Sequence, residues 1–124
     1  MNIEKLREVC LAVPGSTESI QKTYDEIVAF KVMDKVFAAT ALAPRGGRFL
    51  VHLKCARERI AELRERYQGI IAPPFMDHPW NFVYLESDVP DALIVELIHH
   101  SVEEVVKNLP RSKREEYQNT HSIG

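Results

Sequence analysis

The sequence predicts an α+β domain, in which a mainly antiparallel sheet of five or six strands is covered by three helices. Two observations predict this class. Segments rich in β-branched and aromatic residues follow one another between residues 27 and 53, at turns too short for a parallel crossover. Apolar residues recur at helical spacing in three other segments. A chain of 124 residues, 45% of them hydrophobic, predicts one core, and we expect the domain to span 1–110 with a flexible basic tail over 111–124.

The first element is predicted to be an amphipathic helix near the N-terminus. Its apolar side chains lie three or four positions apart, at Leu6, Val9, Cys10 and Val13, and the Pro14-Gly15 pair ends it. The polar segment 16–24 is interpreted as a turn followed by an edge strand.

Three strands are predicted next, over residues 27–32, 35–40 and 48–53. Met33-Asp34 is a connection short enough for a hairpin, and Gly46-Gly47 suits a second turn because glycine adopts positive φ without steric cost. The three strands should therefore form an antiparallel meander.

The second half of the chain is predicted to hold two more helices and an intervening strand. Apolar residues at Ala56, Ile60, Leu63 and Tyr67 mark a helix that Gly69 is placed to end. Pro73-Pro74 makes the segment 70–76 an extended loop or a short edge strand, and residues 80–85 form another strand. A long third helix starts near Asp88 and Pro90 and stops at Pro110.

Charge is distributed unevenly along the chain. The net charge is −2, so the protein lacks the global positive field of a strong nucleic-acid binder. Residues 45–66 nevertheless hold seven basic side chains against three acidic ones, whereas residues 67–106 hold seven acids and no Lys or Arg. A polarised surface follows if these two stretches occupy different faces.

The order of several local strings resembles the MmcQ/YjbR family over roughly residues 3–114. These strings are Phe30-Lys31-Val32 through Lys35-Val36-Phe37-Ala38, Leu53-Lys54-Cys55, Arg64-Glu65-Arg66-Tyr67-Gln68-Gly69, Trp80-Asn81-Phe82-Val83, and Val89-Pro90 through Leu97-Ile98 and His100-Ser101 to Leu109-Pro110. The resemblance implies an antiparallel sheet with helices packed against it, an architecture likened to frataxin folds and described as double-wing. It also implies DNA binding, because members of this family are commonly described so.

The first functional hypothesis is a non-enzymatic module that binds DNA weakly and without sequence preference. Basic side chains would contact phosphates and release counterions. The candidates are Arg45, Arg48, Lys54, Arg57, Arg59, Arg64 and Arg66. A solvated helix face explains the same residues, since Glu58, Glu62 and Glu65 interleave with them. The discriminating observation is whether the basic side chains converge without intervening carboxylates.

The second hypothesis is a protein-interaction or small-ligand module. It would use the loop from Phe75 to Trp80 together with the acidic final helix. Its candidate contact residues are Phe75, His78, Trp80 and Tyr84, and the rings of Phe75, Trp80 and Tyr84 would form an aromatic platform. The alternative interpretation of Trp80 is that its side chain is an aromatic anchor in the core.

The sequence carries no signature of several classes of function. No nucleophile elbow, phosphate-binding glycine loop or His-Glu-x-x-His helix is present, so we expect no enzyme and no cofactor. The His, Cys and Asp residues have no spacing that commits two ligands to one metal. Cys10 and Cys55 are expected to be buried free thiols. No apolar run is long enough for a membrane span and no hydrophobic signal core begins the chain, so we expect a cytoplasmic protein.

Overall fold

Six strands form one antiparallel sheet in the computed structural model, which describes residues 1–22, 26–44, 46–74 and 79–121. Their order across the sheet is β1-β2-β3-β4-β6-β5. Their bounds are β1 Thr17–Lys22, β2 Glu26–Val32, β3 Lys35–Ala41, β4 Leu50–Lys54, β5 Ile70–Ile71 and β6 Trp80–Tyr84. The predicted fold class is confirmed, as are the edge strand near residue 20 and the three-stranded meander.

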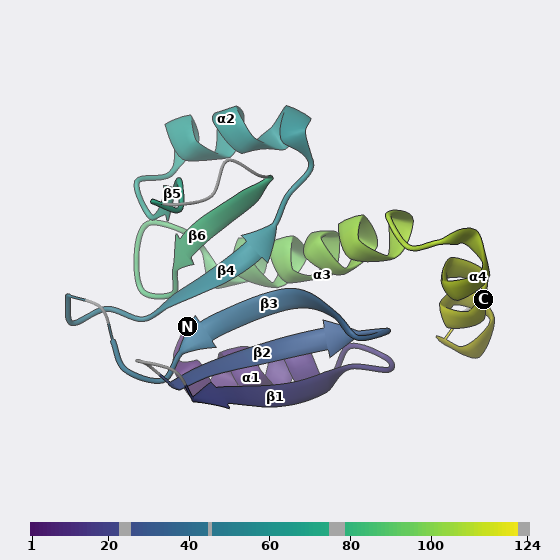
Figure 1. Cartoon of the computed structure of the whole chain (residues 1–124). Helices are drawn as coiled ribbons and strands as arrows, with labels where there is room; N and C mark the ends of the chain where they lie inside the picture. The colour runs from purple at the N-terminus through teal and green to yellow at the C-terminus, as the bar shows by residue number, and fades with distance from the viewer. Residues whose placement is uncertain (23–25, 45, 75–78, 122–124) are drawn as a thin grey trace.

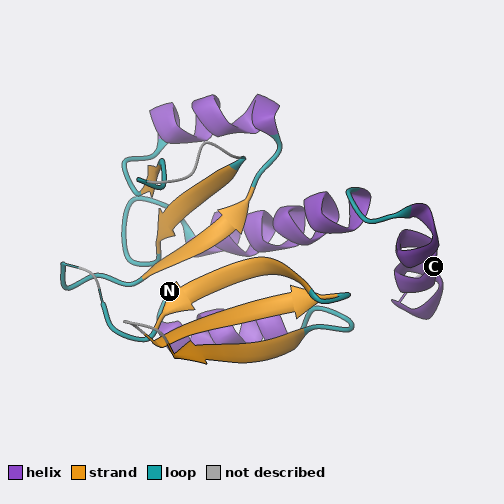
Figure 2. Cartoon of the chain, viewed as in Figure 1, coloured by secondary structure: helices purple, strands orange, loops and turns teal. Residues whose placement is uncertain are grey.

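The helices are α1 Ile3–Leu11, α2 Arg57–Arg66, α3 Asp91–Lys107 and α4 Arg111–His121. Figures 1 and 2 show α1 behind β1 and β2 and α3 behind the centre of the sheet, with α2 near the β5 and β6 edge. The core lies between the sheet and this helix layer, where Phe30, Phe37, Leu53 and Ile98 are almost completely buried. The opposite face of the sheet carries none of the described helices.

The first hairpin is formed as the sequence predicts. Met33 and Asp34 connect β2 to β3 with φ values of 50° and 63°, the left-handed conformation that a two-residue hairpin turn requires. The register between these strands shifts at Phe30 and Lys31, where β3 contributes one extra residue.

The prediction of three helices was wrong, because residues 111–121 form a fourth helix where we expected a flexible tail. None of the residues of α4 is buried, which agrees with the absence of an apolar period in this segment. Two ring side chains hold α4 against the segment after α1: the Tyr117 hydroxyl donates to the carbonyl of Pro14 at 2.8 Å, and the His121 ring lies against Gly15. The Tyr117 ring lies 4.8 Å from the ring of His121.

The expected boundaries near Gly69 and Asp88 also need correction. Helix α2 ends at Arg66 with Tyr67 as its C-cap, and Gly69 leads into β5, while α3 begins at Asp91 after Pro90. The Asp88 carboxylate instead accepts hydrogen bonds from the backbone N–H groups of Gln68 and Gly69, at 2.7 and 2.8 Å. These two bonds lower the pKa of Asp88, because they favour its charged form.

Candidate functional site

The uncovered face of the sheet carries a row of aromatic side chains from β6. Alternation along the strand directs Asn81 and Val83 into the core and leaves Trp80, Phe82 and Tyr84 half-buried on the opposite face. Figure 1 shows the sheet with α1 and α3 on its far side. We call the uncovered side the open face. Trp80 is thus not the core anchor that one interpretation of the sequence favoured.

His52 adds a fourth ring to the open face from the neighbouring strand β4. Its imidazole centroid lies 4.7 Å from that of Trp80 and 5.0 Å from that of Phe82. Burial among these rings lowers the pKa of His52 to about 4, so the imidazole is neutral at physiological pH. Its Nε2 is buried and has no hydrogen-bond partner among the described residues.

A shallow hollow lies beside His52. It has a volume of about 120 Å³ and is lined mainly by apolar side chains, which are Ile27, Ala39, Thr40, Ala41, Leu50, His52 and Phe82. The His52 ring is among the side chains that line the hollow, while its Nε2 is covered by neighbouring atoms.

Cations border the aromatic row. The Arg48 guanidinium lies 4.1 Å from the centre of the Tyr84 ring, a cation–π contact, and also donates to the Glu86 carbonyl at 3.4 Å. Lys54 follows His52 by two positions on β4, and Lys31 lies on the same face of β2. The described strand positions on the open face hold no Asp or Glu. Glu18 points to the helix layer and pairs there with Arg7, and Glu26 precedes Ile27, which lines the open-face hollow, so the Glu26 side chain is directed to the opposite face.

The arginines of α2 do not converge on a surface free of carboxylates. Arg59 pairs with Glu96 of α3 at 3.0 Å, and Arg66 lies 3.9 Å from Glu62. Arg64 is half-buried and donates to Asn81 Oδ1 at 2.7 Å and to the Trp80 carbonyl at 3.2 Å. Arg57 is exposed at the start of the helix. Carboxylates therefore intervene among these cations.

The structure instead combines members of the two predicted sets. Arg48 and Lys54 from the proposed DNA-binding set lie on the open face beside Trp80 and Tyr84 from the proposed ligand set. Arg45, Phe75 and His78 lie outside the described residues. His52 and Phe82 were missed, although their alternation with Val51 and Val83 placed them on the same face as Trp80.

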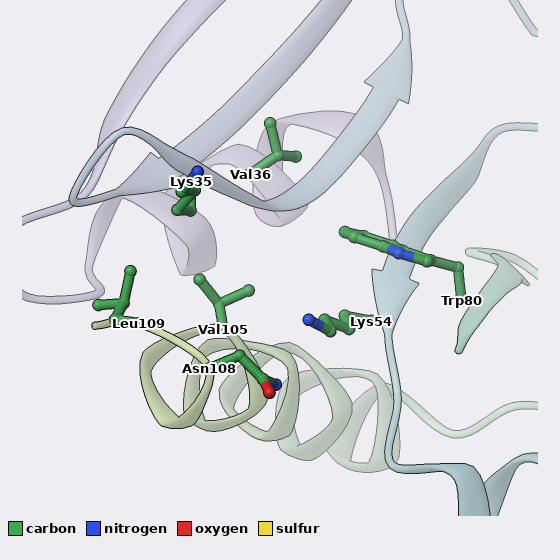
Figure 3. Close-up of a pocket in the computed structure, with 7 residues that line it drawn as sticks. All are labelled: Lys35, Val36, Lys54, Trp80, Val105, Asn108 and Leu109. Carbon is green, nitrogen blue, oxygen red and sulfur yellow. The ribbon is translucent and has the colours of Figure 1, made fainter. Parts of the chain in front are cut away.

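A cleft opens where β3 and β4 separate. Only two residue pairs join these strands, Ala38 with Leu53 and Ala39 with His52. Beyond them lies a cavity of about 340 Å³, lined by Lys35, Val36, Lys54, Trp80, Val105, Asn108 and Leu109. Figure 3 shows the Lys54 side chain and the Trp80 indole extending into it from β4 and β6, with Lys35 at the opposite rim.

The histidines and cysteines elsewhere have structural surroundings. His100 Nε2 accepts a hydrogen bond from the Ala56 backbone N–H at 3.0 Å, next to the start of α2, whereas His99 is exposed. Cys10 and Cys55 are buried and free, as expected. In the part of the chain that the structure describes, no three His, Cys, Asp or Glu side chains are grouped to hold a metal ion. None of the described helices has the length and apolarity to cross a membrane.

The fold and the open face define a two-layer α+β protein with one exposed antiparallel sheet. The YjbR family profile matches residues 11–103, so this chain belongs to the YjbR family. The Uncharacterized protein YjbR of Escherichia coli K12 is 30% identical over 115 residues, which cover 92% of this chain and 95% of that protein. The crystal structure of Deinococcus radiodurans protein DR2400, assigned to domain DUF419, is similar with a TM-score of 0.80 and 30% identity, covering 93% of this chain and 86% of that one.

Proposed function

We propose that this protein binds single-stranded nucleic acid through the open face of its sheet and catalyses no reaction on it. The observation that carries the proposal is the row of Trp80, Phe82 and Tyr84, bordered by cations on a face whose described strand positions hold no carboxylate. Every base has a flat π face that stacks on an aromatic ring, and cations nearby neutralise the phosphates.

The spacing of the row favours a single strand over a duplex. Side chains two positions apart on a strand are about 6.7 Å apart, roughly twice the 3.4 Å rise per nucleotide of duplex DNA. Bases that occupy successive rings must therefore be unstacked from one another. An unpaired strand allows this, whereas a duplex would first have to be opened.

His52 gives the face a polar contact for a base edge. Its ring lines the hollow of about 120 Å³, and its Nε2 is covered and has no partner among the described residues, so a base edge reaches this nitrogen only after a neighbouring side chain shifts. Because burial keeps this imidazole neutral, it bonds to a base amide or carbonyl without attracting a phosphate. This supports a role for His52 in positioning a base between the aromatic rings.

The test is fluorescence anisotropy of a labelled oligothymidylate and of a labelled duplex at low and moderate salt. We expect the single strand to bind more tightly, with a log–log salt slope of about −0.7 for each phosphate contacted. Tyr84→Ala should weaken binding by about 1–3 kcal/mol, the contribution of one stacked base, and Lys31→Met should make the salt slope shallower by about 0.7.

The matched control is the double variant Arg57→Ala/Arg66→Ala on α2. These arginines are exposed but lie away from the open face, so the variant should bind the oligonucleotide as the wild type does. Loss of affinity in this variant with no effect of Tyr84→Ala would place the contact on α2, as the sequence first suggested. No binding at low salt would refute nucleic-acid binding altogether.

A further inference from the structure

We propose that the cleft between β3 and β4, which shares Lys54 and Trp80 with the open face, is a binding site for a small aromatic acid, meaning a planar ring that bears one carboxylate or similar anionic group. The cleft is the cavity of about 340 Å³ described above. Its size falls in the range of about 300–1,000 Å³ that is usual for small-molecule sites.

The opening is built into the fold. Past the pair Ala38 and Leu53, the Ser101 hydroxyl takes the place of a strand-to-strand hydrogen bond, accepting from the Lys54 N–H at 3.0 Å and donating to the Phe37 carbonyl at 2.6 Å. Because a side chain of α3 holds the two backbones at this distance, the strands stay apart without leaving these backbone groups unsatisfied.

The walls of the cleft favour a flat apolar body. Val36 lines the cleft from β3, Val105 and Leu109 line it from the C-terminal end of α3 and the residues after it, and the Trp80 indole lines it from β6. A planar ring placed among them gains contact with the aliphatic side chains and an aromatic contact with the indole.

The polar groups of the cleft favour an anion. Lys35 and Lys54 reach it from opposite strands, and the described lining residues include no Asp or Glu. Asn108 completes the rim, with its Nδ2 already donating to the Glu104 carbonyl at 2.7 Å. An anionic group between the two ammonium groups would receive charge-assisted hydrogen bonds from both sides.

The test uses 2-naphthoate as the probe and its neutral counterpart 2-naphthamide as the comparison. Trp80 is the only tryptophan, so its indole N–H gives one NMR resonance that reports on the cleft. We expect naphthoate to shift this resonance saturably and to bind about tenfold more tightly than naphthamide, because only the acid pairs with the lysines.

Two lysines of one hairpin separate this site from the proposed nucleic-acid face. Lys35 lines the cleft, whereas Lys31 lies on the open face opposite Val36. Lys35→Met should weaken naphthoate binding about tenfold and leave oligonucleotide binding unchanged. Lys31→Met should do the reverse, so each proposal can fail while the other stands.

Methionine keeps the length of the lysine stem, and the indole resonance of each variant without ligand checks that its fold is intact. The proposal is overturned if naphthoate leaves the indole resonance unmoved at millimolar concentration. It is equally overturned if Lys35→Met and Lys54→Met both bind naphthoate as tightly as the wild type does, since the ligand would then not use the two cations.

Discussion

The hydroxyl of Ser101 donates a hydrogen bond of 2.6 Å to the backbone carbonyl of Phe37 and is itself fully buried. It also accepts from the backbone N–H of Lys54 at 3.0 Å, so one helix side chain joins β3 and β4 where their own ladder stops. Hydrogen bonding between β3 and β4 therefore continues through Ser101 although the two strands separate here. The cleft lies where they separate.

Ser101→Ala should lower the free energy of unfolding by about 2–4 kcal/mol. The substitution leaves the buried carbonyl of Phe37 and the partly buried N–H of Lys54 without a partner, and the loss of a partner costs about 1–3 kcal/mol for a buried group. Urea unfolding followed by circular dichroism measures the change. Ser112→Ala, at an exposed position of α4, is the control and should stay within about 0.5 kcal/mol of the wild type.

Arg64→Ala should also destabilise the protein, by about 1–3 kcal/mol, because it removes the hydrogen-bond donor to the buried Asn81 side chain. Arg64→Lys should recover only part of this, since an ammonium does not reproduce the two directed bonds of the guanidinium. Arg57→Ala on the same helix serves as the control and should be nearly neutral. Equal stability of Arg57→Ala and Arg64→Ala would contradict a structural role for Arg64.

His52 should make stability depend on pH. Burial lowers its pKa from 6.5 to about 4 in the native state. Between these values the unfolded chain binds a proton that the native chain does not, so stability is complete above pH about 6.5 and falls toward pH about 4. We expect a loss of about 1–2 kcal/mol, reduced from the full linkage value because His52 is partly exposed.

His52→Phe keeps a planar ring beside Trp80 and removes the titration, so its stability should vary less over this pH range than that of the wild type. His99→Gln, at an exposed position on α3, should leave the pH dependence unchanged. Urea unfolding at several pH values measures both. An unchanged pH dependence in His52→Phe would show that this imidazole is not depressed in pKa.

The two thiols should resist alkylation in the native protein. Burial raises the pKa of Cys10 to about 12 and that of Cys55 to about 11, so neither forms appreciable thiolate at neutral pH. Mass spectrometry after iodoacetamide treatment should find both unmodified in buffer and both modified in urea. Modification of Cys55 alone in buffer would indicate that the segment between β4 and α2 opens.

Local patterns in the sequence predict most of the elements. Side chains that face the core alternate with those on the open face in β2, β3 and β6, and α3 carries an apolar stripe, because each element buries one face. Both patterns are visible in the sequence of the segment itself. Helix α4 was missed because it lacks that stripe and is held by distant contacts, from Tyr117 to Pro14 and from His121 to Gly15. The sequence of residues 111–121 has no pattern that predicts a contact with a residue 103 positions earlier in the chain.

For the candidate site, the sequence by itself determined which side chains exist and which alternate to the same face of a strand. The sequence could not predict which charged side chains remain free to contact a ligand, because the partners of Arg59 and Arg64 come from α3 and β6. Only the tertiary structure placed Arg48 and Lys54 beside Trp80 and opened the cleft at Ser101. The physical reason is that alternation is local, whereas strand order and helix packing set the neighbours of a side chain across the whole chain.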